Sequence, residues 1–413
     1  MTAMNNRDQI SRGKNMRGKR ALRLMGCAAA VMLWAATPVV FAQDGELPQS
    51  LTAHYKTVPL DDASATKVRH AIDAAVAAPG LPMWNYSITS PLDGNTYNGT
   101  MVGSNPFFNG ARTTNIPTYV IPLIIVLPDG SRFDPTEIDN CSPQATPLNQ
   151  VLGSPIFQSN SYTINGINMG PGQYIDAFQR ANFYDSNVSK TGESYHTVLN
   201  PITTLPAQTI NIPTNEGESW NLNKCGNLGI IDYATFNSIL VNTVIPSLAS
   251  QGVGPASFPF FVVHDVVMGN PGDSIYQNCC LIGYHGATGS PTQTYAVADY
   301  DTTGLFANDP NIVPTSQEVG DWMDDPLGTN TAPAWGNLQR APGCSTSLEV
   351  GNPMIGDYFS QSGNTGILMP NGITYDPQEL AFFSWFYRES PSMGAGGVYS
   401  DSGTFTSAQP VCN

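Results

Sequence analysis

The chain has 413 residues and a net charge of −15, with 17 Lys and Arg against 32 Asp and Glu. Such an acidic balance excludes nucleic acid and anionic membranes as expected partners, because both are themselves negatively charged. Hydrophobic residues make up 41% and charged residues only 12%, with 39 Gly and 33 Pro, so the composition excludes a disordered chain and favours a loop-rich, strand-rich protein.

Residues 1–42 have the layout of a secretory signal peptide. Seven basic residues precede an apolar segment from about Leu24 to Val40, and a small residue, Ala42, stands at the expected cleavage position. Cleavage there leaves 10 basic against 31 acidic residues, a net charge of −21. No later stretch has the eighteen or so apolar residues of a membrane span. We therefore expect export to a secreted, periplasmic or extracellular location.

Six of the 7 cysteines follow the expected cleavage position: Cys141, Cys225, Cys279, Cys280, Cys344 and Cys412. An even number in an exported chain predicts up to three disulfide bonds, whose pairing the sequence leaves open. A bond between the neighbours Cys279 and Cys280 would be strained, so we expect each to pair with a distant cysteine.

The pattern of apolar residues predicts helices and strands in both halves of the chain. The expected helices cover residues 61–78, 173–183, 232–248 and 376–388, and the expected strands cover short segments within 85–115 and residues 118–127, 258–268 and 294–300. The sum is an α+β domain. We divide the chain into a signal peptide (1–42), an N-terminal helix with short strands (43–115) and the main α+β domain (116–413).

The motif of greatest interest is Gln317-Glu318-Val319-Gly320-Asp321. It is similar to the H-E-x-x-H zinc-binding helix, with both histidines replaced and the glutamate kept. Residues four apart share one helix face, so Gln317 and Asp321 could hold one ion beside Glu318. Amide and carboxylate oxygens are harder ligands than imidazole, which favours calcium, or no metal, over zinc.

The sequence around this motif resembles an exported bacterial family with the pattern S-H-E-[IV]-x-E-W-M-x-D-P followed by Pro-x-Trp, Gly-Cys and E-V-G-D-P. Here the corresponding segments are residues 316–326, 333–335, 343–344 and 349–353, and the likeness extends to 279–285, 297–300 and 378–387. More remotely, the chain resembles the plant exordium-like extracellular proteins.

This resemblance implies a disulfide-stabilised, zincin-like metallopeptidase domain after a strand-rich, loop-rich N-terminal part. Glu318 would be the general base, and a divalent metal, zinc or calcium, would be held by Gln317, Asp321, Glu349 and His285. The chain departs from the family pattern at Gln317, Asp321 and Asn352, and each departure lowers the affinity for zinc. A peptide or protein substrate is the implied partner.

Other interpretations of these residues stay open. Pro314 favours a helix that begins there, and carboxylates near a helix start are stabilised by its dipole without catalysis. His285 fits a hydrogen-bonded structural role as well as a ligand role. His264 and Asp265 lie in one predicted strand, where neighbours face opposite sides, which argues against a catalytic dyad.

Two further classes of enzyme were weighed. A glycosidase using Glu318 and Glu349 would be favoured by exposed Trp322 and Trp335, but we expect both indoles to be buried. Serine-hydrolase and nucleotide-binding motifs do not occur in the sequence. The two function hypotheses are therefore an exported metallopeptidase-like protein with degenerate zinc ligands, and a catalytically inactive extracellular binding or structural protein.

Overall fold

The computed structural model describes residues 52–413 apart from 75–79, 108–111, 192–194, 222–224, 270–279, 307–308, 310, 337–343, 362–363, 410–411 and 413. The expected signal peptide and Cys279 lie outside these residues. The described residues fall within one unit, residues 47–413.

A large mixed sheet organises this unit. Its main path is β10 (Gly217–Asn221), β11 (Asn227–Asp232), β13 (Val266–Gly269), β14 (Leu281–Thr288), β15 (Gln293–Tyr300), β12 (Phe258–His264), β4 (Arg112–Val126) and β5 (Arg132–Phe133). Three more strands join it: β1 (His54–Val58) pairs with β14, while β8 (Tyr195–Thr204) and β9 (Gln208–Asn211) pair with β4.

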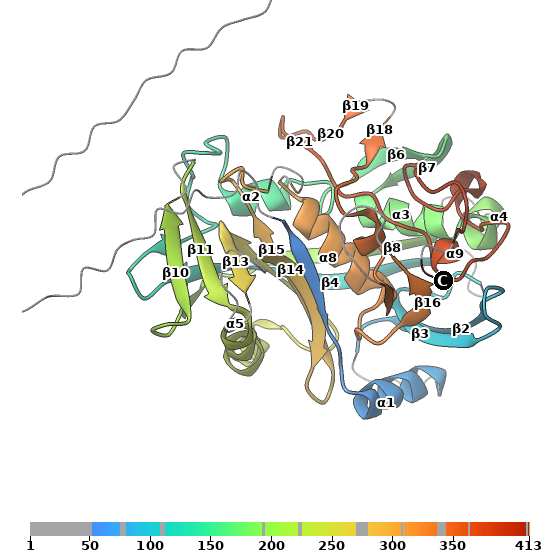
Figure 1. The fold of residues 1–413 in the computed structure, drawn as a ribbon, viewed down its shortest axis with the longest axis horizontal. Coiled ribbons are helices and arrows are strands. Elements are labelled where there is room, and N and C mark those ends of the chain that lie inside the picture. The colour runs from blue at the N-terminus through green and yellow to red at the C-terminus, as the bar shows by residue number, and fades with distance from the viewer. Residues whose placement is uncertain are drawn as a thin grey trace, which may run out of the picture. The chain divides into compact units, whose positions relative to one another are not determined.

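The sheet curls into a half-barrel, which corrects the predicted fold class (Figure 1). The pairs β12–β15, β12–β4 and β11–β13 are parallel, and β14–β15 is antiparallel. A strand-rich, curled mixed sheet does not match the α+β zincin-like domain expected from the resemblance. The prediction of an α+β zincin-like fold was therefore wrong. It depended on a short motif, and the residue types of a short motif do not determine the order of strands in a sheet.

Helices cover both faces of the sheet because its central strands are apolar on both sides. On one face, α8 (Val313–Asp324) packs on β14 and β15, and Trp322 stacks on Phe258 with ring centroids 3.6 Å apart. On the other face, Phe236 from α5 (Tyr233–Ile239) contacts the ring of Tyr284. Alternate residues of β12, such as Phe260 and Phe261, therefore enter two different cores.

Most predicted elements occur close to their expected places. Asp61 caps α1 (Asp62–Asp73), and α3 spans Tyr174–Asn182. The helical segment from Tyr233 to Ser247 consists of α5, η3 (Leu240–Val244) and α6 (Ile245–Ser247). Pro314 lies in the first turn of α8, as its ring requires.

The predicted helix at residues 376–388 is wrong: only α9 (Phe383–Phe386) is helical there, although its aromatic side chains are buried as expected. The remaining helices are α2 (Pro147–Leu152), η1 (Tyr184–Val188), α4 (Ser189–Thr191), η4 (Ala249–Gln251), η5 (Asn352–Met354) and η6 (Ala395–Gly397). The small strand pairs are β2 (Met83–Thr89) with β3 (Thr96–Val102), β6 (Asn160–Ile164) with β7 (Ile167–Gly172), β16 (Thr331–Trp335) with β17 (Ser345–Ser347), β18 (Ser360–Gln361) with β19 (Asn364–Thr365), and β20 (Ile367–Leu368) with β21 (Thr374–Tyr375).

One predicted strand is two strands joined by an unusual residue. The run 258–268 divides at Asp265, whose φ of 50° lies in the left-handed region that L residues rarely adopt. β12 pairs with β15 as far as His264, whereas β13 pairs with β14 at Met268. The chain therefore passes from one edge of the β14–β15 hairpin to the other at Asp265.

Two disulfide bonds hold loops of the described chain, Cys141–Cys225 and Cys344–Cys412. Cys280 is also disulfide-bonded. The expectation for Cys279 lies outside the described residues, and the distant cysteines Cys141, Cys225, Cys344 and Cys412 pair with one another, so none of them is the partner of Cys280. The disulfides indicate an oxidising, extracellular-type environment. Within the described residues, no helix combines the length and apolar character needed to cross a membrane.

Candidate functional site

The residues predicted from the motif converge around α8, in what we call the helix cluster: Gln317, Glu318, Asp321, His285, Glu349 and Asn352. α8 supplies the first three, β14 supplies His285, and Glu349 lies just before η5. Gln317, Glu318, Asp321, His285 and Glu349 are each at most 8% exposed. The sequence therefore identified a buried polar cluster.

Glu318 and His285 are in direct contact, with Glu318 Oε2 3.1 Å from His285 Nδ1. The contact depends on Gly283 of β14, because a Cβ there would lie 2.8 Å from Glu318 Cγ. Burial, reinforced by the charges of Asp321 and Glu349, raises the pKa of Glu318 well above its usual value. Burial lowers the pKa of His285 to about 3. Burial therefore favours the uncharged form of each group, a protonated carboxyl and a neutral imidazole.

The other members of the helix cluster are held by internal hydrogen bonds. Asp321 Oδ1 accepts from the backbone N–H of Gly351 at 2.7 Å, and Gln317 Nε2 donates to Asn352 Oδ1 at 2.7 Å. Glu349 accepts hydrogen bonds from Asn352 Nδ2 and from Thr57 of β1. Burial, followed by the charge of Glu349, raises the pKa of Asp321. These contacts fix the loop before η5 against α8.

The helix cluster does not have the spacing of a metal site. Among the described residues, His285, Glu318, Asp321 and Glu349 do not bring three ligand atoms within 4.8 Å of one another. Two buried oxygens, Gln317 Oε1 and Glu318 Oε1, have no hydrogen-bond partner in the described chain. The cluster therefore contains a buried, hydrogen-bonded Glu318–His285 pair and two acceptor oxygens that no described residue uses.

The two tryptophans near the motif bear on the glycosidase alternative. Trp322 and Trp335 are 0% and 3% exposed, as expected from the sequence. Trp322 Nε1 donates to Thr294 Oγ1 and Trp335 Nε1 donates to the carbonyl of Ser347. Neither indole can stack on a sugar, so the geometry does not favour a glycosidase at Glu318 and Glu349.

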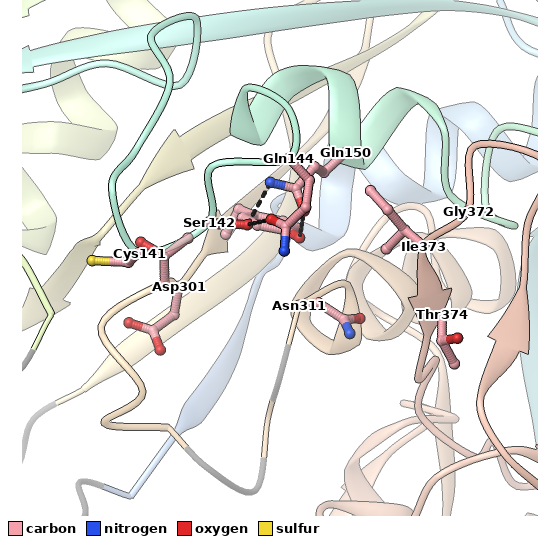
Figure 2. A pocket seen from close by; sticks show the side chains of 11 residues that line it. Cys141, Ser142, Gln144, Gln150, Asp301, Asn311, Gly372, Ile373 and Thr374 are labelled. Atoms are coloured by element: carbon pink, nitrogen blue, oxygen red, sulfur yellow. Dashed lines mark hydrogen bonds between the residues drawn. The ribbon is translucent and has the colours of Figure 1, made fainter.

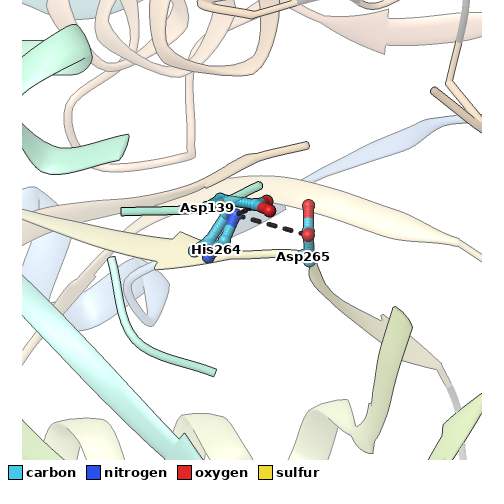
Figure 3. A group of neighbouring side chains, drawn as sticks. All are labelled: Asp139, His264 and Asp265. Atoms are coloured by element: carbon cyan, nitrogen blue, oxygen red, sulfur yellow. Dashed lines mark hydrogen bonds and ion pairs between the residues drawn. The ribbon is translucent and has the colours of Figure 1, made fainter. Parts of the chain in front are cut away.

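A second group, which we call the strand-end cluster, consists of Asp139, His264, Asp265 and Thr302. Figure 3 shows the first three. His264 is the last residue of β12, and Thr302 follows the parallel neighbour β15 by two residues. Asp139 lies in the loop after β5. Carboxyl ends of neighbouring parallel strands meet at one edge of a sheet, which is where open α/β sheets commonly bind ligands.

The polar atoms of the strand-end cluster surround one nitrogen. His264 Nε2 lies 3.1 Å from Asp139 Oδ2, 3.1 Å from Thr302 Oγ1 and 3.3 Å from Asp265 Oδ2. Thr302 Oγ1 also donates to Asp265 Oδ2 at 2.9 Å and contacts Asp139 Oδ2. The imidazole N–H and the Thr302 O–H are the two side-chain donors here, and the oxygens of Asp139, Asp265 and Thr302 share them.

The charges in this cluster compete. Burial, with a further contribution from Asp301, raises the pKa of Asp265 to about 7. The hydrogen bond from His264 holds the pKa of Asp139 well below its usual value. Burial alone would lower the pKa of His264, but the hydrogen bond to Asp139 and the charge of Asp265 outweigh burial and raise it. A cation at this point would neutralise the excess of carboxylates.

Two cavities flank the strand-end cluster. One, of about 310 Å³, is lined by Asp139, His264 and Asp265 together with residues 131–134 and 137–138. The other, of about 400 Å³, includes Thr302 and Cys141 in its wall (Figure 2). The Cys141–Cys225 bond adjoins both cavities, because Cys141 lines the second and Gly226, next to Cys225, lines the first. A Cβ at Gly226 would lie 3.6 Å from Asp265 Oδ2.

The sequence argues against a catalytic dyad of His264 and Asp265, because neighbouring residues of a strand face opposite sides of the sheet. The left-handed backbone at Asp265 removes the alternation on which that argument depended. A sequence signal was nevertheless present, because polar residues follow immediately after two strongly apolar strands, at 264–265 and at 301–302. Asp139 carried no comparable signal.

Comparison of the chain with protein-family models, with curated proteins and with solved structures gave no match. The resemblance to the exported bacterial family therefore stays a prediction.

Proposed function

We propose that the protein is an exported protein that binds a divalent metal ion at the strand-end cluster. The observation that carries the proposal is the convergence of four donor atoms, from Asp139, His264, Asp265 and Thr302, around one point. Export rests on the signal-peptide pattern of residues 1–42 and on the disulfide bonds.

The spacing of these donors suits a small divalent ion. His264 Nε2 lies 3.1 to 3.3 Å from its three neighbours, and Thr302 Oγ1 lies 2.9 Å from Asp265 Oδ2. The centre of a tetrahedron with such edges lies about 1.9 Å from each corner, close to the length of zinc–nitrogen and zinc–oxygen bonds, about 2.0 to 2.2 Å. Calcium takes six to eight oxygens at greater distance, so it fits less well.

The ligand types narrow the choice further. One imidazole and two carboxylates form a mixed set of nitrogen and oxygen ligands, which suits zinc or manganese. The set contains no sulfur ligand, so it does not favour ions that prefer thiolates. The cavity of about 310 Å³ beside Asp139, His264 and Asp265 leaves one side open to a small molecule. An ion with an open coordination position lowers the pKa of bound water, so hydrolysis is the chemistry that such a site would supply.

The test is metal binding by the purified mature protein, measured by calorimetric titration with Zn²⁺ and Mn²⁺ and by thermal melts with and without chelator. We expect saturable binding of one ion, and a melting temperature that falls in chelator. His264→Ala should weaken binding at least about a hundredfold, since it removes a direct ligand. Glu318→Gln, in the helix cluster, is the matched control and should bind the ion as the wild type does.

Two results would count against this proposal. No ion bound by the wild-type protein is the first. The second is a Glu318→Gln variant that loses metal binding while His264→Ala keeps it, because that result would place the metal site in the helix cluster.

A second candidate function is peptide-bond hydrolysis at the helix cluster. The observation that favours it is the Glu318–His285 contact, in which burial shifts the two pKa values in opposite directions, as in many acid–base pairs. The unpartnered Glu318 Oε1 leaves an acceptor for a water or substrate atom. The competing proposal for this cluster is a catalytically inactive extracellular binding or structural protein, a pseudo-peptidase.

A peptide library digested with wild-type protein and with Glu318→Gln separates these two candidates. Cleavage by the wild type that the variant lacks supports hydrolysis, because the amide keeps the size of Glu318 but cannot transfer a proton. Equal absence of cleavage in both proteins, with equal thermal stability at neutral pH, supports the pseudo-peptidase.

A further inference from the structure

The cavity of about 400 Å³ on the other side of Thr302 has a composition of its own. Its wall brings together residues from three separate parts of the chain: 141, 142, 144 and 150; 300–302 and 311; and 372–374 (Figure 2). Its size falls within the range of about 300 to 1,000 Å³ that is typical of small-molecule sites. It does not belong to the helix cluster, and it contains no atom of Asp139, His264 or Asp265 in its lining.

Internal hydrogen bonds orient one amide in this cavity. Tyr300 donates to Gln150 Oε1 at 2.8 Å, and Gln150 Nε2 donates to Ser142 Oγ at 2.7 Å. Ser142 Oγ in turn donates to Gln144 Oε1 at 3.1 Å. Because Gln144 Oε1 already accepts, the amide turns its Nε2 donors towards the cavity. Gln144 Nε2 has no partner in the described chain.

Asn311 supplies a second side-chain amide to the cavity, and its oxygen is likewise held by hydrogen bonds. Asn311 Oδ1 accepts from the backbone N–H groups of Ile312 and Asp376 at 2.5 and 3.3 Å, which leaves Asn311 Nδ2 as a free donor within the described chain. Thr374 adds a hydroxyl to which the described residues likewise offer no partner. The cavity therefore holds polar groups that have no partner among the described residues, with Gln144 and Thr374 exposed to solvent and Asn311 half-buried.

The electrostatics of the cavity decide which ligand these donors suit. Its lining contains no Lys, Arg or His, and it does contain the carboxylate of Asp301. With a net charge of −15 on the whole chain, an anionic ligand would be repelled. A peptide would need apolar subsites, and Ile373 is the one aliphatic side chain of the lining. Amides, hydroxyls and one carboxylate match the hydroxyl groups of a neutral sugar, each of which both donates and accepts.

We infer that this cavity, which we call the polyol pocket, binds a neutral carbohydrate of one or two sugar units through Gln144, Asn311, Thr374 and Asp301. The inference does not rest on metal binding at the strand-end cluster. Since Thr302 borders both sites, the two ligands would nevertheless lie close together.

The experiment is a binding screen of the mature protein by ligand-observed NMR and calorimetry. The probes are glucose, galactose, mannose and xylose with their β-linked disaccharides, and glucuronate, glucose 6-phosphate and a mixed tripeptide set serve as comparisons. We expect one or more neutral sugars to bind. Gln144→Met and Thr374→Val, which keep side-chain size but remove the hydrogen-bonding groups, should each weaken binding about three- to tenfold.

Two controls separate this inference from the proposed metal site. Asp265→Asn should lose metal binding but keep sugar affinity, while Gln144→Met should lose sugar affinity but keep the metal. Binding of no neutral sugar, preference for the charged sugars or the peptides, or equal affinity in wild type and both pocket variants would overturn the inference. None of these outcomes depends on whether the ion binds.

Discussion

The helix cluster and the strand-end cluster contain the same types of residue but use them differently. In the helix cluster, Asp321 accepts a backbone N–H and Glu349 accepts from Thr57 and Asn352. In the strand-end cluster, two carboxylates and a hydroxyl converge on His264 Nε2, which has one proton to offer. The comparison teaches that the partners of a carboxylate, more than its place in a motif, distinguish a structural group from a candidate ligand.

The largest expected effect tests which disulfide supports the strand-end cluster. Cys141–Cys225 closes a loop with a sequence separation of 84, and Cys344–Cys412 one of 68, so removing either bond with paired serines should cost about 4 kcal/mol of unfolding free energy. Only the first pair lies beside Asp139 and Gly226. Denaturant melts should therefore show similar losses, while metal titration should weaken in Cys141→Ser/Cys225→Ser alone. Equal metal affinity in both variants would contradict the difference.

Asp321→Ala should be the most costly single change in the helix cluster. It leaves the N–H of Gly351 buried without an acceptor and opens a small cavity, so we expect a loss of about 3 kcal/mol in urea unfolding. Asp321→Asn keeps the acceptor and should lose at most about 1 kcal/mol. If the two variants were equally stable, Asp321 would not be holding the loop before η5.

Gly283→Ala tests the close approach of α8 to β14. The added methyl would lie 2.8 Å from Glu318 Cγ, and relieving that overlap should cost about 2 kcal/mol. Combining it with Glu318→Ala makes room for the methyl, so the double variant should lose less than the sum of the two single variants. Additive losses in thermal or urea melts would mean that Gly283 is needed for another reason.

The pH dependence of stability that Glu318 contributes should have the opposite sign to the one that Asp139 contributes. The pKa of Glu318 is raised by burial in the folded state, so its contribution is present below its usual value of 4.5 and is lost as the pH rises above that value. The slope is about 1.4 kcal/mol per pH unit while the folded protein keeps the extra proton. Glu318→Gln should flatten this slope in metal-free protein.

The pKa of Asp139 is depressed, so its contribution is present above 3.8 and is lost as the pH falls below that value. Asp139→Asn should therefore flatten only the acid limb of the stability curve. Urea melts across the pH range, with the two variants side by side, measure both effects. A Glu318→Gln curve parallel to the wild type would show that the carboxyl is not protonated in the fold.

Local elements were predictable because local physics fixes them. The Asp61 cap, the first-turn Pro314 and the apolar run of β12 each carry a signal within a few residues. The contact of Glu318 with His285, 33 residues apart, was foreseen only in outline, as two members of one site. The half-barrel was not predicted from the sequence, because the order of strands in the sheet depends on pairings between distant segments.

The strand-end cluster shows most clearly where sequence reasoning fails. Side chains alternate between the two faces of a strand only while every residue keeps β-region backbone angles. The sequence of residues 264–266 does not indicate that Asp265 adopts a left-handed conformation. Asp139 and Thr302 reach His264 from 125 and 38 residues away. Such a meeting depends on how the sheet curls, which the order of residue types does not specify.

The left-handed turn at Asp265 has a mechanical consequence. His264 ends a strand held by β4 and β15, and Val266 begins one held by β11 and β14, so Asp265 links the two strands that lie on either side of the β14–β15 hairpin. Thr302 and Asp139 bind across that junction from two other loops. An ion bound by these side chains would cross-link the ends of β12 and β15 with the loop that contains Asp139. Removing the ion should therefore increase the hydrogen-exchange rates of the backbone amides of β11 and β13 more than those of β12 and β4.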